Sequence, residues 1–264
     1  NVFKIYSDLK SKCKATSLKG RLQPGEDINS YLLKVAVSST SDCGTLFRKT
    51  ETSNDALILI WLSIIKQRAQ DACLYNDIKY NTPLTDSTLR EFTKLNQQPH
   101  SIKDIANILA KEYGIILIVE KYFPTMKLDG CAFKLINGTP VIGISARYNR
   151  YDNFWFTLTH ELAHIVLHYD YLNSPILDNF DSESSQDIEV EANRLATDSL
   201  IPRNILRKML LNKDNLGRIL ELSSQAECHP AISAGIIRHR TNQWSLYSDL
   251  VNFMDVRSEL GIND

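Results

Sequence analysis

Hydrophobic and polar residues follow two different periods along the chain, which predict helices in some segments and strands in others. Residues 54–75 begin with a run that is apolar nearly all round, residues 154–167 are apolar at most positions, and neither segment contains a proline, which is typical of buried helices. Residues 115–119 are instead a short, β-branched run typical of a buried strand. Asn137-Gly138 lies between two further strand-like runs and predicts a hairpin turn. The pattern therefore predicts an α+β fold, with a small sheet flanked by helices.

The predicted elements fall into two regions. Residues 1–97 are expected to form a mostly helical N-terminal region, and the sequence Gln97-Gln-Pro-His100 has the character of a linker. Residues 98–264 contain all the predicted strands and the remaining helices. We therefore predict a domain boundary near residue 97.

The helix predicted at residues 154–167 contains His160-Glu161-Leu-Ala-His164. Residues four apart lie one turn apart on the same face of a helix, so both imidazoles can bind one metal ion. Glu161 lies beside that face, where a carboxylate can act as the general base of metal-assisted hydrolysis. The alternative is an interior helix whose two histidines are merely hydrogen-bonded. The spacing and the buried setting favour the metal site.

A third metal ligand is expected on a second helix, predicted for residues 189–202. Glu189 and Asn193 are four residues apart and share one face. We predict Glu189 as the ligand and Asn193 as the hydrogen-bond partner of a metal-binding imidazole. Glu191 is the weaker candidate ligand, because helical geometry rotates it about 200° from Glu189. The alternative for both acids is a solvated helix N-terminus, where carboxylates suit the helix dipole.

Other polar side chains are candidates for contacts with the substrate or with an oxyanion. His168 lies two helical turns from His160, roughly 12 Å along the axis, which is too far to share its metal. We expect His168 in a pocket wall, on the surface or in contact with substrate. Hydrolysis also needs a donor for the oxyanion; the candidates are Arg147, Tyr148, His229, Arg238 and His239, of which Arg238 and His239 are preferred. A strand at residues 142–145 is expected at a sheet edge, where an extended peptide can pair with it.

Several separate segments, taken in order, resemble one family. The resemblance is carried by residues 152–168 (DNFWFTLTHELAHIVLH), 189–196 (EVEANRLA) and 200–202 (LIP), with 127–133, 140–147 and 229–238 in support. These segments resemble the ImmA/IrrE metallopeptidases, and most closely the subset found in HigA-like antitoxin regulators. The resemblance implies a zincin-like metallopeptidase domain with one zinc ion per chain. It assigns His160, His164 and Glu189 as zinc ligands and Glu161 as the catalytic acid/base.

The resemblance also implies two alternative functions. One is a zinc endopeptidase that cleaves a regulatory protein, of the repressor or toxin type. The other is an antitoxin or transcription regulator whose peptidase-like domain binds or senses a partner without cutting it. HigA-like proteins carry a helix-turn-helix domain that is not evident here. The chain begins at Asn1 rather than Met, so the resemblance leaves open whether such a domain has been removed, and we expect DNA contacts only through a domain of that kind.

Composition narrows the class of partner. The chain of 264 residues has a net charge of −1 and a pI near 6.7, so it lacks the overall basic charge typical of nucleic-acid binding. Residues 222–240 superficially resemble a helix-turn-helix, but two packed helices are favoured because only Arg238 and Arg240 add positive charge. Five widely spaced cysteines without a CxxC pair argue against disulfides and predict a cytoplasmic location. No apolar run predicts a membrane span.

Overall fold

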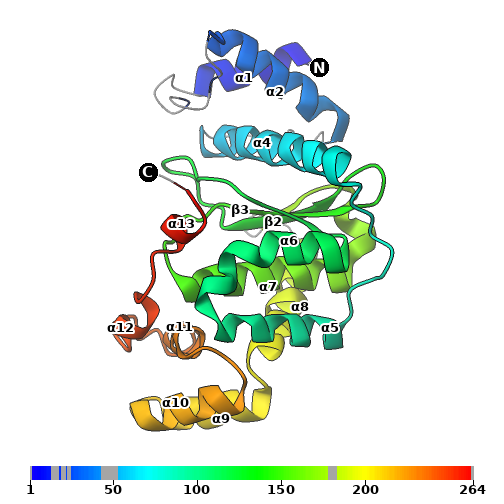
Figure 1. Ribbon diagram of the computed structural model, residues 1–264. Helices are drawn as coiled ribbons and strands as arrows, with labels where there is room; N and C mark the ends of the chain where they lie inside the picture. Colours follow the sequence, from blue (N-terminus) through cyan, green and yellow to red (C-terminus); the bar gives the residue numbers. More distant parts are fainter. Residues whose placement is uncertain are drawn as a thin grey trace.

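The computed structural model describes residues 2–12, 18, 22, 25–42, 53–177 and 183–262 (Figure 1). The longer helices are α1 (Val2–Lys12), α2 (Ile28–Asp42), α4 (Ser53–Asn76), α5 (Asp86–Thr93), α7 (Tyr151–His168), α8 (Glu183–Leu200), α9 (Arg203–Leu211), α10 (Leu216–Gln225) and α11 (Pro230–Thr241). Short helical segments are η2 (Lys94–Gln97), η3 (Pro99–Asp104), α6 (Ile105–Ile108), η4 (Leu109–Tyr113), η5 (Tyr169–Asn173), α12 (Ser248–Val251) and α13 (Val256–Glu259). The strands are β1 (Ile116–Val119), β2 (Gly130–Lys134), β3 (Pro140–Ile144) and β4 (Ile176–Leu177).

The four strands form one mixed sheet in the order β1-β3-β2-β4. Strand β1 is parallel to β3, whereas β2 is antiparallel to both β3 and β4. The predicted hairpin is confirmed: β2 and β3 are joined through Gly138, whose φ of 86° is readily available only to glycine. The predicted α+β class, with a small sheet flanked by helices, is confirmed.

The expectation that residues 142–145 lie at a sheet edge is wrong. Strand β3 has a neighbour on each side, with Ile142 opposite both Leu117 of β1 and Ala132 of β2. All five residues of β3 are buried. Pro140 is accommodated because it is the first residue of the strand, where a missing N–H interrupts few ladder bonds.

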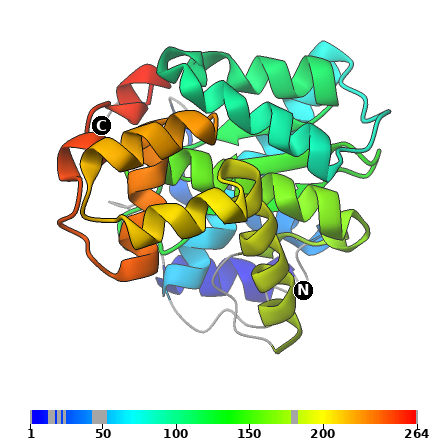
Figure 2. The ribbon, with the colours of Figure 1, turned by 90° about the horizontal axis from the view of Figure 1, so that it is seen from below.

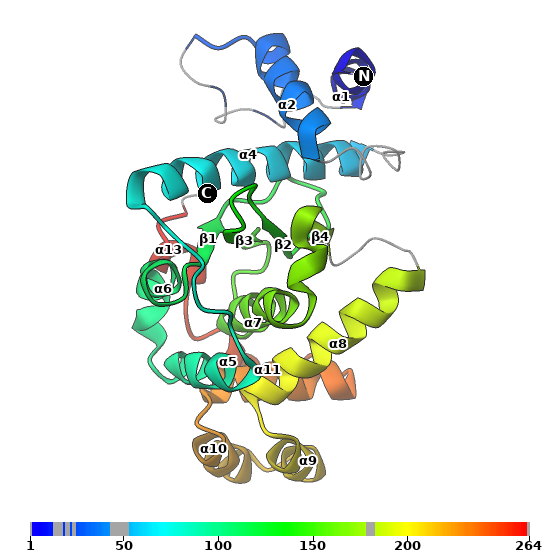
Figure 3. The same cartoon turned by 90° about the vertical axis from the view of Figure 1, so that its right-hand side faces the viewer.

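Helices cover both faces of the sheet, with α4 on one side and α7 on the other (Figure 3). Alternate strand residues face opposite layers: Val141 joins the apolar cluster under α4, and Ile142 joins the one around α7. Helix α4 lies so close that a Cβ on Gly143 would be 3.0 Å from the Trp61 ring. The Trp61 indole also donates a hydrogen bond of 3.2 Å to the Glu120 carbonyl, fixing α4 over the end of β1.

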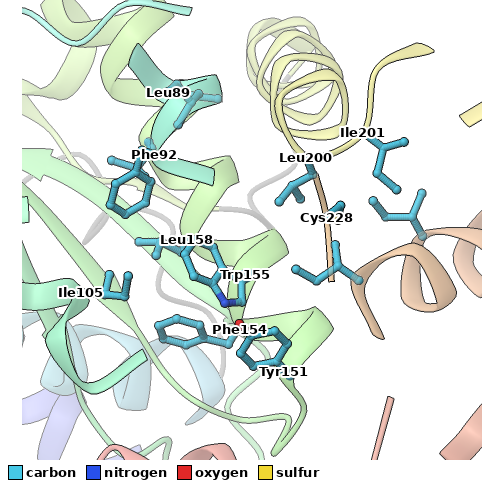
Figure 4. Close-up of a cluster of buried hydrophobic side chains, with 14 of the residues drawn as sticks. Leu89, Phe92, Ile105, Tyr151, Phe154, Trp155, Leu158, Leu200, Ile201 and Cys228 are labelled. Atoms are coloured by element: carbon cyan, nitrogen blue, oxygen red, sulfur yellow. The ribbon is translucent and has the colours of Figure 1, made fainter. Parts of the chain in front are cut away.

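The larger core lies around α7 (Figure 4). Trp155 is fully buried there and contacts the ring of Phe92 from α5. Helices α1 and α2 lie beyond α4, while α9, α10 and α11 lie together on the opposite side of the molecule (Figures 1 and 2). Residues before and after position 97 contribute to both apolar clusters. The boundary near residue 97 stays a prediction.

Helix α11 is an internal element of this fold. Residues 231–238 are buried, and the helix packs against α7. Residues 222–240 therefore form packed helices, the interpretation that the sequence favoured over a DNA-reading motif. None of the helices in the described part of the chain combines the length and apolar character that a bilayer crossing requires.

Candidate metal centre

Helices α7 and α8 bring three predicted ligands together. His160 and His164 lie one turn apart on α7, and their Nε2 atoms are 3.0 Å apart. Glu189 reaches them from α8, with Oε2 3.1 Å from His160 Nε2 and Oε1 3.4 Å from His164 Nε2. These are among the most extensively packed helices of the fold, so the convergence depends on a large apolar contact rather than on a flexible loop.

The three donor groups fit a divalent cation. Two imidazole nitrogens and a carboxylate oxygen are the His₂Glu set of catalytic zinc sites, with bonds of about 2.0–2.2 Å. A tetrahedral ion with such bonds separates its ligand atoms by roughly 3.3 Å. The two Nε2 atoms are 3.0 Å apart, and each lies near that value from one carboxylate oxygen of Glu189, His160 at 3.1 Å from Oε2 and His164 at 3.4 Å from Oε1. The geometry therefore suits one tetrahedral ion with a fourth position left for water.

Glu189 is held in the form that binds a cation. Burial raises the pKa of its carboxyl group, but hydrogen bonds and charge from His160 and His164 outweigh this and lower the pKa to about 2. The side chain is 19% exposed, and both imidazoles are buried. The carboxylate is therefore ionised at neutral pH, which metal ligation requires.

A cavity of about 830 Å³ reaches this cluster. Its wall includes His160 and Glu189. The Phe156 ring, also in the wall, stacks beside the His160 ring, with the two ring centroids 6.4 Å apart. The wall also includes apolar residues (Ile232, Ile236 and Trp244) and charged residues (Asp129, Arg150, Asp152 and Arg240). A space of this size, part apolar and part charged, suits a peptide segment rather than a single small ion.

The family model of peptidase M78, described as the IrrE N-terminal-like domain, matches residues 95–229. The chain belongs to this family. The match confirms the resemblance to ImmA/IrrE metallopeptidases and contains all three converging residues. Searches among curated proteins and solved structures give no match. The chain therefore belongs to a zincin-like metallopeptidase family, and this match identifies neither a substrate nor a partner.

In this M78 domain, Glu161 lies between α7 and the sheet. The side chain is completely buried, and its carboxylate is turned toward β2. A Cβ on Gly130 would be 2.3 Å from Glu161 Oε1 and 2.8 Å from Thr157 Cγ2. Glycine at position 130 is therefore what leaves room for the carboxylate. The sequence predicted Glu161 beside the ligand face but gave no sign of its dependence on β2.

Two residues expected to contact substrate lie elsewhere in the M78 domain. Arg238 is buried outside the cavity wall, and its Nη2 donates a hydrogen bond to the Trp244 carbonyl. His168 is also buried and outside the wall, because it lies behind His164. Of the three candidates, His239 is the one that lines the cavity.

The residue that contacts His164 Nδ1, the ring nitrogen facing away from the candidate metal centre, is not the predicted Asn193. Asn193 is exposed and lines the cavity of the M78 domain. The bond expected from Asn193 to the free nitrogen of an imidazole is instead made to His164 by His168, with the two Nδ1 atoms 3.1 Å apart. His168 in turn contacts Glu191, the acid judged the weaker ligand. The helical spacing of residues 160, 164 and 168 was the one signal in the sequence for this contact.

Proposed function

We propose that this M78 domain is a zinc-dependent endopeptidase that cleaves a regulatory protein partner, of the repressor or toxin type. The observation that carries the proposal is the convergence of His160, His164 and Glu189 at a cavity large enough for a peptide. Family membership supports it, because M78 members are zincin-like metallopeptidases. One zinc ion per chain is part of the proposal, as is a cytoplasmic location, which the widely spaced cysteines favour.

The residues divide the proposed reaction between them. His160, His164 and Glu189 would hold zinc, which supplies a Lewis acid that polarises the peptide carbonyl and makes water more acidic. Glu161 would take a proton from the attacking water. The water oxygen bonds to the carbonyl carbon, the C–N bond breaks, and Glu161 returns the proton to the leaving amine. Of the two preferred oxyanion donors, His239 is the one in the cavity wall, where Tyr148 also lies, and it would contact the oxyanion.

The second candidate function is a non-cleaving regulator of the HigA-like type, whose cavity binds or senses a protein partner. One observation favours it. The Glu161 carboxylate is completely buried against Gly130 and does not line the cavity, so it is not positioned beside an entering peptide. In this alternative the metal would stabilise the α7–α8 contact, and DNA binding would depend on a separate helix-turn-helix region.

A cleavage experiment separates the two functions. The zinc-loaded protein is incubated with a peptide mixture prepared from a whole proteome, and new termini are counted by mass spectrometry. We expect cleavage by wild type and none by Glu161→Gln, with zinc content near one per chain in both. Absence of cleavage by zinc-loaded wild type would favour the regulator. Equal cleavage by Glu161→Gln would remove Glu161 from the role of base.

A further inference from the structure

Behind the candidate metal centre, hydrogen bonds link a buried ligand to the protein surface. His164 Nδ1 lies 3.1 Å from His168 Nδ1, and His168 Nε2 lies 3.0 Å from Glu191 Oε2. The His164 side chain is fully buried and that of His168 is 5% exposed, whereas that of Glu191 is 66% exposed. The series Glu191–His168–His164, which we name the histidine relay, thus extends from solvent to the metal centre.

The carboxylate at the outer end sets the proton positions along this relay. A carboxylate only accepts hydrogen bonds, so His168 Nε2 carries the proton that bonds to Glu191. A neutral imidazole carries one proton, which leaves a lone pair on His168 Nδ1. His164 Nδ1 must then donate, and in the neutral form of His164 that metal ligation requires, its Nε2 is left with a lone pair. That Nε2 is the atom that faces His160 and Glu189.

We propose that His168 and Glu191 are positioning residues for the metal centre: they fix the tautomer and ring orientation of His164 so that Nε2 is presented as a ligand. The inference rests on the proposed function, since it assumes that the three converging residues hold zinc. Metal-binding histidines generally donate their second ring N–H to an acceptor that orients them. Here that acceptor is a second imidazole, itself oriented by a carboxylate from α8.

The arrangement also connects the two ligand helices. Helix α8 contributes Glu189 to the metal centre and Glu191 to the relay, although helical geometry points the two side chains in different directions. His168, at the last residue of α7, reaches past His164 to meet Glu191. A shift of α8 relative to α7 would therefore disturb one ligand directly and a second through its orientation.

The test is zinc affinity, measured by competition with a chromophoric chelator. His168→Leu removes the acceptor and should weaken zinc binding by about 10- to 100-fold, the usual effect of losing such a partner. His168→Asn should bind closer to wild type than to His168→Leu, because Asn Oδ1 is two bonds from Cβ, as Nδ1 is, and accepts the same hydrogen bond. Glu191→Ala should weaken binding by about tenfold.

Asp187→Ala is the matched control for Glu191→Ala, because it removes another exposed carboxylate from α8. It should leave zinc affinity unchanged. Urea unfolding of each metal-free variant separates affinity from folding, and Glu191→Ala carries the test if His168→Leu does not fold. A purely structural role for His168 would lower stability in both His168 variants and leave the Glu191→Ala affinity at the wild-type value.

The outcomes distinguish this inference from the proposed function. Tight zinc binding by wild type, with Glu191→Ala equal to Asp187→Ala and no difference between His168→Asn and His168→Leu, would overturn the relay and leave the endopeptidase proposal standing. Absence of zinc binding by wild type would overturn both. The expected graded loss would support the relay whether or not the protein cleaves peptides.

Discussion

The closeness of α11 to α7, which shapes the cavity wall, makes Gly235→Ala a sensitive substitution. A Cβ at position 235 would lie 2.1 Å from Asp152 Oδ2 and 2.7 Å from Asp152 Cβ. Asp152 is 6% exposed and is held by Arg150 in a two-pronged ion pair, with Nε 3.0 Å from Oδ1. Because Asp152 Cβ is bonded directly to the α7 backbone, the 2.7 Å contact can be relieved only if α7 and α11 shift apart, while the 2.1 Å contact displaces the carboxylate from Arg150.

The expected size of the effect follows from three opposing contributions. Replacing a helical glycine by alanine gains about 1 kcal/mol of helix propensity. Overpacking a close contact costs about 1–3 kcal/mol. Breaking a fully buried ion pair costs about 3–5 kcal/mol; the Arg150 side chain is 25% exposed, so a displaced Asp152 loses only part of that amount. The net expectation is that the free energy of unfolding falls by about 2–4 kcal/mol.

Urea unfolding of the metal-free protein measures this change without any knowledge of the substrate. Gly217→Ala is the matched control, because its added Cβ would contact only Asn215 Oδ1, at an ordinary 3.6 Å. It should be neutral or slightly stabilising. Asp152→Ala removes the obstructing carboxylate, so the double variant with Gly235→Ala should lose less stability than the sum of the single losses. A Gly235→Ala protein as stable as wild type would refute the close α7–α11 contact.

Three further predictions test other parts of the domain. Gly130→Ala should displace the Glu161 carboxylate by about 1 Å and reduce peptide cleavage about 100-fold while zinc content is unchanged; wild-type cleavage would contradict the role of Glu161. The depressed pKa of Glu189 contributes stability that is present above its ordinary pKa of 4.5 and is lost as pH falls toward about 2. Metal-free wild type and Glu189→Gln should thus differ at pH 5 by at most roughly 3 kcal/mol in unfolding free energy and converge near pH 2. Arg90 donates to the carbonyls of Ser199, Leu200 and Ala226, so Arg90→Ala should cost about 2–4 kcal/mol in urea unfolding, and Arg90→Lys should not restore it.

The residues of the candidate metal centre could be predicted because the arguments that select them are mostly local. The spacing of His160 and His164 places both on one face of any helix, whatever surrounds that helix. Choosing Glu189 over Glu191 required only the direction in which each side chain leaves α8. Neither argument depends on knowing how the sheet is ordered, and the structure brings together the three residues that these arguments selected.

The order of the sheet could not be obtained in this way. Strand β3 gains its second neighbour from β1, which precedes it by more than twenty residues and joins it in parallel. Turn chemistry at Gly138 predicts the pairing of β2 with β3 but carries no information about the other side of β3. The near-continuous apolar run of β3 is typical of a strand covered on both faces, and it was the available sign that β3 is internal.

The histidine relay was missed because two sound exclusions were applied to separate helices. His168 is too far along α7 to share a metal with His160, and Glu191 points away from Glu189 on α8. Both statements concern one helix at a time. When α7 and α8 pack, the two excluded side chains meet each other, 3.0 Å apart. A residue that orients a metal-binding histidine contacts the ring nitrogen that faces away from the metal, so it lies too far away to bind the metal itself. The two residues excluded as ligands therefore met the condition for this supporting role. The contact between His168 and Glu191 depends on how α7 and α8 cross, and the periodicity of the sequence carries no information about that crossing.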